Sequence, residues 1–185
     1  MFADNTLTPK EAIRLCALGT LALAESPMRY SELANAIRHF TSRISGPSLD
    51  IMGTSIELLK LESLVEPIDG VGMEDDATLR LTDKGQGELK TLMISRIRSG
   101  GGEVNKLITT LKLRFLHLLD ISEQCEQADM LIENCETELA RLDDLRAHHE
   151  NDPGFLTVWL DHDIELLETH LDWLEHFRDS LTASD

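Results

Sequence analysis

The chain has 185 residues and a mass of 20.8 kDa, enough for one domain of ordinary size or for two small ones. Aromatic residues make up only 4% of a globular composition, so aliphatic side chains must build the core. With 17 basic and 34 acidic residues the net charge is −17, which excludes a protein that is basic over its whole surface and holds nucleic acid by charge alone. No apolar run reaches the roughly 18 residues of a membrane-spanning helix, and residues 1–10 lack the basic start of a signal peptide. We therefore expect a cytoplasmic protein with no membrane partner.

A glycine run at residues 100–102 separates two stretches of different charge. Residues 1–100 hold 11 basic and 14 acidic residues, net −3, whereas residues 101–185 hold 6 and 20, net −14. Three consecutive glycines leave the backbone free and give nothing to pack. We predict a domain boundary there, with one domain over residues 1–99 and a second over residues 103–185.

Capping and turn signals divide the first hundred residues into four helices and a hairpin. Thr8, Pro9 and Glu11 have the spacing of a capping box with proline at the first helical position. Ser48 and Thr82 are candidate N-caps of later helices. Two short β-prone runs flank an acidic turn and predict a hairpin with a long loop. The predicted elements are helices over residues 8–24, 31–38, 48–63 and 83–98 and strands over residues 65–68 and 77–81.

The second domain is predicted to be almost entirely helical, because apolar residues recur at alternating steps of three and four. A turn at residues 151–154 separates its two longest helices. The last helix carries a second apolar stripe at intervals of seven, formed by Trp159, Leu166 and Trp173. Two stripes on one helix indicate two packing partners, so we assign these three residues to a contact with a second subunit. A ligand-pocket wall and an ordinary intramolecular core are the alternatives.

Several short passages resemble regulators of the PadR and AphA-like families. Residues 79–85 (LRLTDKG) resemble the R-L-T-x-x-G passage from the second wing strand into the next helix. Residues 30–33 (YSEL) resemble the opening of the second helix, and residues 59–65 (LKLESLV) the exit from the recognition helix. The acidic helical tail resembles the dimerisation domain of AphA-like virulence activators. The resemblance covers residues 8–180.

This resemblance implies a mainly α fold with a small β-hairpin wing, in which a winged helix-turn-helix domain precedes an antiparallel helical dimerisation domain. It implies a homodimeric DNA-binding transcriptional regulator of a palindromic double-stranded site, with half-sites about 34 Å apart and helix 48–63 in the major groove. Some members of these families respond to small phenolic or other apolar effectors. The sequence does not identify an effector here, whether small molecule or protein.

The candidate DNA contacts are cations and hydroxyl groups on or beside the helix-turn-helix and the wing. The segment from Arg38 to Arg43 combines both kinds of group without a carboxylate, which favours phosphate contact as much as a solvated loop. The complete set is Arg29, Arg38, Thr41, Ser42, Arg43, Ser45, Ser48, Thr54, Ser55, Lys60 and Arg80.

Two features of the sequence depart from a DNA-binding pattern. The third helix is apolar on both sides, with Ile56 on one side and Leu58 and Leu61 on the other, where groove-reading polar residues are expected. A helix buried on both sides would explain this pattern. The predicted wing loop carries acidic residues 74–76, which phosphates would repel. The alternative function is therefore a winged-helix module that binds a protein partner.

The sequence contains no strong motif for a metal site or for a catalytic site. His162-x-x-Glu165 and Asp144-x-x-x-His148 have spacings that acidic helices produce readily, and no Glu-x-x-His unit of a di-iron bundle occurs. Cys16, Cys125 and Cys135 lack CxxC spacing and fall in apolar positions. No G-x-S-x-G and no glycine-rich loop after a strand is present. We predict no catalytic residues, no metal and no cofactor.

Overall fold

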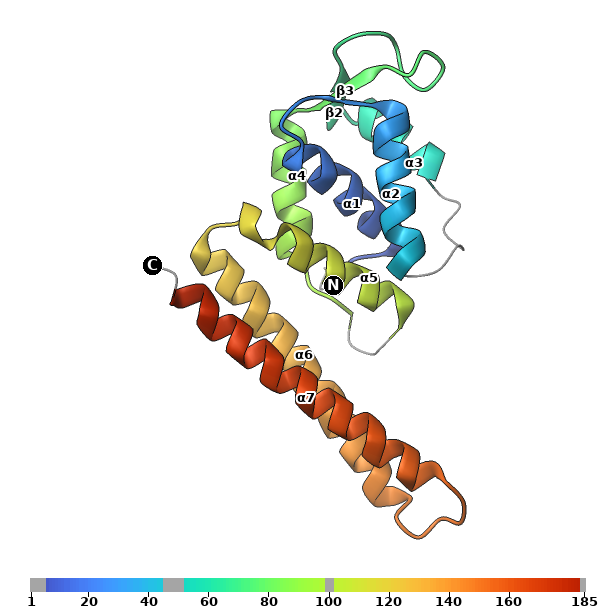
Figure 1. Ribbon diagram of the computed structural model, residues 1–185, viewed down its shortest axis with the longest axis vertical. Coiled ribbons are helices and arrows are strands. Elements are labelled where there is room, and N and C mark those ends of the chain that lie inside the picture. The colour runs from blue at the N-terminus through green and yellow to red at the C-terminus, as the bar shows by residue number, and fades with distance from the viewer. Residues whose placement is uncertain (1–5, 45–51, 99–101, 184–185) are drawn as a thin grey trace, which may run out of the picture. The chain divides into compact units, whose positions relative to one another are not determined.

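The chain folds into two compact units, which are described separately (Figure 1). The computed structural model describes residues 6–44, 52–98 and 102–183, with only the backbone of 52–55. The first unit combines the N-terminal helices and the wing with Gly102–Leu116, and the second begins at His117. The helix that follows the glycine run therefore packs with the N-terminal unit, whereas the sequence had placed it in the second domain.

The first unit has the predicted order of three helices, a hairpin and a helix, and the mainly α fold class with a small β wing is confirmed. Two helix ends differ from prediction, since the second helix continues to Ile44 and the fourth ends at Ile94. Its elements are α1 (Pro9–Leu23), β1 (Met28–Arg29), α2 (Tyr30–Ile44), α3 (Met52–Leu61), β2 (Val65–Pro67), β3 (Thr78–Leu81), α4 (Asp83–Ile94) and α5 (Glu103–Phe115).

The wing is a three-stranded antiparallel sheet with strand order β1-β3-β2. Glu66 pairs with Arg80 across β2 and β3, as the predicted hairpin requires. The third strand, β1, was not predicted, because two residues are too short to show an alternating pattern. It pairs Met28 with Leu79 and ties the start of α2 to the wing.

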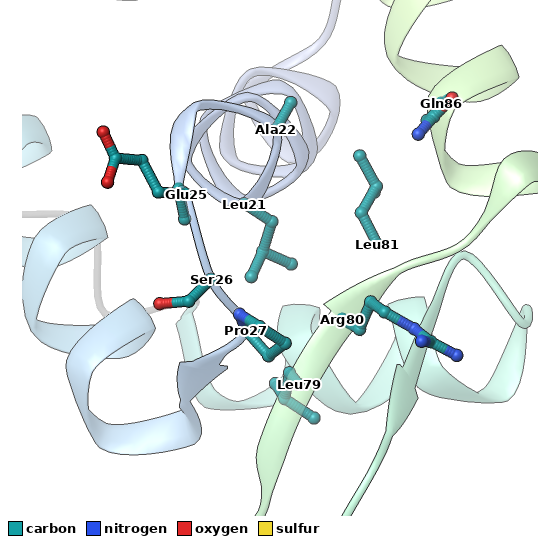
Figure 2. Close-up of a pocket in the computed structure, with 10 residues that line it drawn as sticks. Leu21, Ala22, Glu25, Ser26, Pro27, Leu79, Arg80, Leu81 and Gln86 are labelled. Atoms are coloured by element: carbon teal, nitrogen blue, oxygen red, sulfur yellow. The ribbon is translucent and has the colours of Figure 1, made fainter.

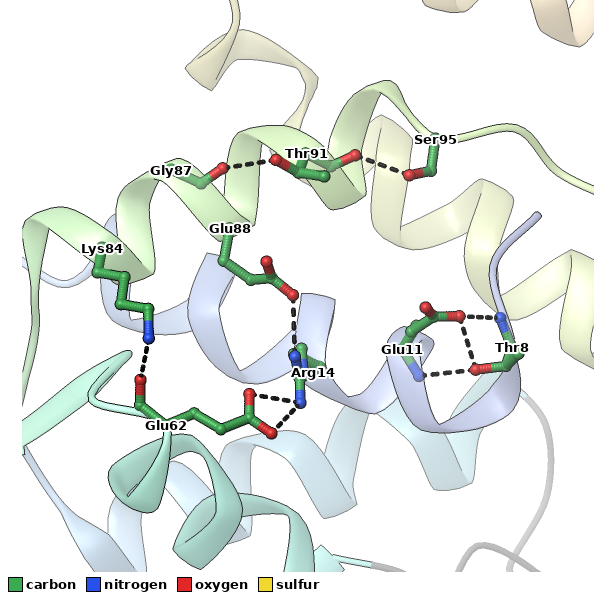
Figure 3. Close-up of polar contacts among 9 residues, drawn as sticks. All are labelled: Thr8, Glu11, Arg14, Glu62, Lys84, Gly87, Glu88, Thr91 and Ser95. Atoms are coloured by element: carbon green, nitrogen blue, oxygen red, sulfur yellow. Dashed lines mark hydrogen bonds and ion pairs between the residues drawn. The ribbon is translucent and has the colours of Figure 1, made fainter. Parts of the chain in front are cut away.

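Helix α1 lies at the centre of the first unit, in contact with α2, α3, α4 and α5. Its capping box is present, since the Glu11 amide donates to the Thr8 hydroxyl and the Thr8 amide donates to the Glu11 carboxylate (Figure 3). Arg14 links α1 to two neighbouring elements through ion pairs. Its guanidinium bonds Glu62 at 2.8 Å and Glu88 at 2.9 Å, which fastens α1 to the end of α3 and to α4.

Helix α5 belongs to the first unit because its apolar face packs against α1 and α2. Leu107, Ile108, Leu111 and Phe115 of this face are buried. The Phe115 ring fills the space beside Gly19 of α1, where a Cβ atom would collide with ring carbons at 2.5 and 2.6 Å. A glycine in the middle of a helix weakens the helix, and here that cost allows the close approach of α5.

We expect Gly19→Ala to lower the free energy of unfolding by about 1–3 kcal/mol, because the buried Phe115 ring has no room to move away. Gly87→Ala in α4 is the matched control, since nothing lies within 4 Å of its added Cβ. Gly87→Ala should stabilise the protein by about 0.5–1 kcal/mol through helix propensity. Urea unfolding of both variants measures the difference, and equal effects would contradict the packing argument.

The second unit is a hairpin of two long helices, α6 (Ile121–His148) and α7 (Leu156–Thr182), preceded by the short helix η1 (Leu116–Leu118). The helices run antiparallel, since Arg146 bonds Asp161 at 2.8 Å near the turn and Arg178 bonds Asp129 at 3.0 Å near the other end. Leu160 and Leu174 of α7 are buried. Within the described residues, no helix has the length and apolar character that crossing a membrane requires.

Candidate nucleic-acid interface

The outer face of α2 carries two of the predicted DNA-contacting cations in exposed positions. Arg38 and Arg43 are exposed and Ser42 is half-buried, while Leu33 and Ile37 hold the opposite face in the core. The Arg38 guanidinium donates to the amide oxygen of Asn35 at 2.9 Å, a neutral partner that leaves its charge uncompensated. Across the described residues, neither arginine lies within ion-pair distance of a carboxylate. Their charge is therefore available to a phosphate.

Thr41 does not belong to this face, which corrects its assignment as a DNA contact. The side chain is buried and its hydroxyl donates to the backbone oxygen of Ile37 at 2.9 Å. Because α2 continues to Ile44, Thr41 falls one turn beyond Ile37 on the buried side.

The second half of α3 presents an apolar outer face. Ile56 and Leu59 are buried, whereas Leu58 is 44% and Leu61 is 76% exposed. The interpretation of a helix buried on both sides is therefore wrong. Thr54 and Ser55 lie in the first half of α3, and the other two predicted hydroxyl contacts, Ser45 and Ser48, lie outside the described residues.

Three of the predicted cations, Arg29, Lys60 and Arg80, are paired with carboxylates. Arg29 lies 3.7 Å from Asp76, and the Arg80 guanidinium lies 2.5 Å from Glu66 on the neighbouring strand.

Lys60 is paired as well. Its ammonium group contacts Glu57 at 2.8 Å and donates to the backbone oxygen of Val71 in the wing loop at 2.8 Å. These three ion pairs leave little net positive charge on the wing side of the unit.

The wing carboxylates hold the loop in shape. Asp75 accepts the amide hydrogens of Gly72 at 2.9 Å and of Val71, and Asp69 accepts the amide and hydroxyl hydrogens of Thr78. These backbone hydrogen bonds lower the pKa of both carboxyl groups. The groups stay ionised at neutral pH, so the wing keeps a negative charge that repels phosphate.

Asp76 has a structural role that the sequence did not predict. Its carboxylate accepts the backbone amide and the hydroxyl of Ser31 at 2.8 and 3.0 Å, which caps the start of α2 from the wing and lowers the pKa of Asp76. Such a cap, 45 residues away in the chain, has no local sequence signal.

A pocket of about 220 Å³ lies between the end of α1, strand β3 and the start of α4 (Figure 2). The side chains of Leu21 and Leu81 enter it, and Glu25 and Gln86 stand at its edge. The Arg80 side chain turns toward β2 and Glu66 instead. Arg80 lines the pocket, but Glu66 already neutralises its charge, and no residue of α2 contributes to the lining.

The second unit exposes the stripe that the sequence assigned to a subunit contact. Trp159, Leu166 and Trp173 are 53%, 57% and 48% exposed on α7. The Trp173 ring stacks on His170 and on Phe177, with ring centroids 5.8 and 5.4 Å apart. A long aromatic stripe that its own hairpin does not cover is typical of an interaction surface.

Comparison with known proteins bears on the whole chain. The model of a family described as "Putative AphA-like transcriptional regulator" matches residues 2–178. The chain belongs to this family. Its members are transcriptional regulators rather than enzymes, so the predicted family and the prediction of a non-enzymatic protein are both confirmed.

Other similarities of this AphA-like protein are distant. HPr kinase/phosphorylases of Bordetella pertussis and Bordetella parapertussis are 25% identical over 126 residues, which cover 65% of this chain. The match spans 41% of the length of those curated relatives. The crystal structure of Bacillus subtilis PadR is 14% identical over 96% of this chain and 98% of that one, with a TM-score of 0.40. Its complex with operator DNA is 15% identical over 91% and 98%, with a TM-score of 0.35.

Proposed function

We propose that this AphA-like protein is a cytoplasmic, homodimeric transcriptional regulator. It binds double-stranded DNA through α2 and the first half of α3. The observation that carries the proposal is that some of the predicted cations have a carboxylate partner and others do not. Arg38 and Arg43 are exposed on α2 without a carboxylate partner in the described residues, whereas Arg29, Lys60 and Arg80 are neutralised. Phosphate contacts position a helix-turn-helix, and the N-terminal residues of its second helix read bases.

The distribution of charge between the units supports this orientation. With α5 included, the first unit carries 14 basic and 15 acidic residues, whereas residues 117–185 carry 3 and 19. A nearly neutral unit joined to one of net −16 directs a polyanion toward the first unit. The acidic second unit also keeps the protein soluble.

The hairpin of α6 and α7 supports dimerisation. Two helices bury only one face of each other, and the stripe of Trp159, Leu166 and Trp173 lies exposed. A second copy would cover this stripe symmetrically, and a twofold dimer carries two copies of the α2 face to a palindromic site.

Selection from sheared genomic DNA at about 0.15 M salt tests DNA binding, followed by sequencing of the retained fragments. Enrichment of a few palindromic sites is expected, with half-sites about one helical turn, roughly 34 Å, apart. Retention of no fragment by folded, dimeric protein would reject the DNA-binding proposal in favour of the protein-binding module.

We expect Trp159→Ala combined with Trp173→Ala to raise the dimer dissociation constant at least about 30-fold, because buried tryptophans contribute about 2 kcal/mol or more to such contacts. Analytical ultracentrifugation across a dilution series measures the change. Val158→Ala is the matched control, since Val158 is 63% exposed on α7 but outside the stripe. An unchanged dimer mass in the double variant would exclude this face as the interface.

A further inference from the structure

Most exposed apolar side chains of the first unit lie on two neighbouring parts of the fold, α3 and the wing. Among the described residues of this unit, seven large apolar side chains are exposed, and only Leu23 and Ile94 lie elsewhere. The other five are on the second half of α3 and on the wing. They are Leu58, Leu61, Ile68, Val71 and Met73. We call these five residues the α3–wing surface.

The wing loop is fastened to the second half of α3 by a hydrogen bond. The Lys60 ammonium donates to the Val71 carbonyl, which brings the loop against the helix. A Cβ atom at Gly72 would meet the Lys60 ammonium and lie 3.1 Å from a Glu57 carboxylate oxygen, so the loop backbone lies close to both α3 side chains. Asp75 holds the same turn from the other side through the amides of Val71 and Gly72.

The surroundings of this surface are acidic. Residues 57–81 contain seven carboxylates and two cations, and both cations are engaged in ion pairs. Arg14 and Arg29, from outside this segment, pair with two further carboxylates, which leaves a net charge of −3. Glu74 is exposed at the tip of the loop, beside Met73. An apolar surface with a net negative charge around it is unsuited to duplex DNA, whose phosphates it repels. It is complementary to a segment that is apolar and basic.

We propose that the α3–wing surface binds a second protein through an amphipathic, basic segment of that protein. Apolar side chains of the segment would cover Leu58, Leu61 and Val71, while its lysines and arginines would meet the surrounding carboxylates. DNA binding is compatible with this partner, because the N-terminal residues of a recognition helix contact bases and the surface lies on the other half of α3. The protein would then join DNA to another protein.

A synthetic amphipathic helix of about 18 leucine and lysine residues is the probe, with a scrambled peptide of the same composition as the reference. Calorimetric titration of the full chain should show at least about tenfold tighter binding of the ordered peptide. Leu61→Ser combined with Val71→Ser should weaken its binding at least about tenfold, since both side chains are 76% exposed. Leu23→Ser combined with Ile94→Ser is the matched control in the same unit and should bind as the wild type does.

Hydrogen exchange locates the peptide and separates this surface from the acidic second unit. Protection of residues 57–73 supports the proposal, and protection of α6 or α7 instead overturns it. Equal binding of the ordered and scrambled peptides, or no binding of either, also overturns it.

DNA retention and dimer mass of the Leu61→Ser, Val71→Ser variant should match the wild type. Loss of DNA retention by the folded variant would assign the surface to the DNA interface, and loss of dimer mass would assign it to self-association; either result rejects a protein partner. If wild-type protein retains no DNA but binds the peptide at residues 57–73, the proposed function fails and this inference stands.

Discussion

Lys112→Met is expected to raise the free energy of unfolding at pH 7 by about 3 kcal/mol. Lys112 is 1% exposed on α5, and its ammonium group donates to the carbonyl of Met93 near the end of α4. Burial lowers its pKa from 10.5 to about 7, because desolvation disfavours the charged form. Methionine fills a similar volume and carries no charge to desolvate.

Stability depends on pH because the folded and unfolded chains bind different numbers of protons at Lys112. Between pH 7 and 10.5 Lys112 is protonated in the unfolded chain and largely neutral in the folded one, so stability rises with pH through this window. The slope approaches about 1.4 kcal/mol per pH unit. Above pH 9 the Cys16 thiol acts in the opposite direction, since burial raises its pKa to about 11. The range from pH 7 to 8.5 is therefore the informative one.

Urea unfolding of wild type and Lys112→Met at several pH values over this range measures the effect. Between pH 7 and 8.5 the free energy of unfolding of the wild type should rise by about 2 kcal/mol more than that of the variant. Lys106→Met is the matched control, because Lys106 is exposed on the same helix. Parallel curves for wild type and Lys112→Met would show that Lys112 is charged in the folded protein.

Local signals in the sequence were enough to locate most helices. The Thr8–Glu11 capping box and the Thr82 cap have hydrogen bonds within three residues, and both helices begin where they were predicted. The boundary between the units could not be predicted from such local signals. Helix α5 joins the first unit through contacts such as Phe115 with Gly19, which are distant in sequence and leave no pattern around the glycine run.

The sequence predicted which residue types make up the candidate site, but not which of its cations lack a carboxylate partner. Sequence identified the cations of the helix-turn-helix and the wing, yet whether each is paired depends on strand register and loop shape. Arg80 meets Glu66 only because β2 and β3 pair at that register. Thr41 did carry a signal, because Leu33, Ile37 and Thr41 follow one another at steps of four along one helical line. Its burial would have been predicted had the helix been extended past Arg38.

The Arg38→Ala, Arg43→Ala double variant should bind operator DNA about 10- to 100-fold more weakly than the wild type at 0.15 M salt. A dimer loses four phosphate contacts, so the slope of log K against log salt should become shallower by about 3.6. Arg29→Ala combined with Arg80→Ala is the matched control. Those arginines are also exposed, but Asp76 and Glu66 already neutralise them, so their removal should leave the slope nearly unchanged.

Fluorescence anisotropy over a salt series compares the two double variants on one operator fragment. All four side chains are exposed, so both variants should keep the wild-type unfolding midpoint, and a change in slope reports on the interface. The wild-type slope itself should stay below about 9, the value for ten phosphates, because few cations face the DNA. Equal loss of slope in both variants would show that the ion pairs of Arg29 and Arg80 open on DNA. An unchanged slope in Arg38→Ala, Arg43→Ala would place the phosphate contacts away from α2.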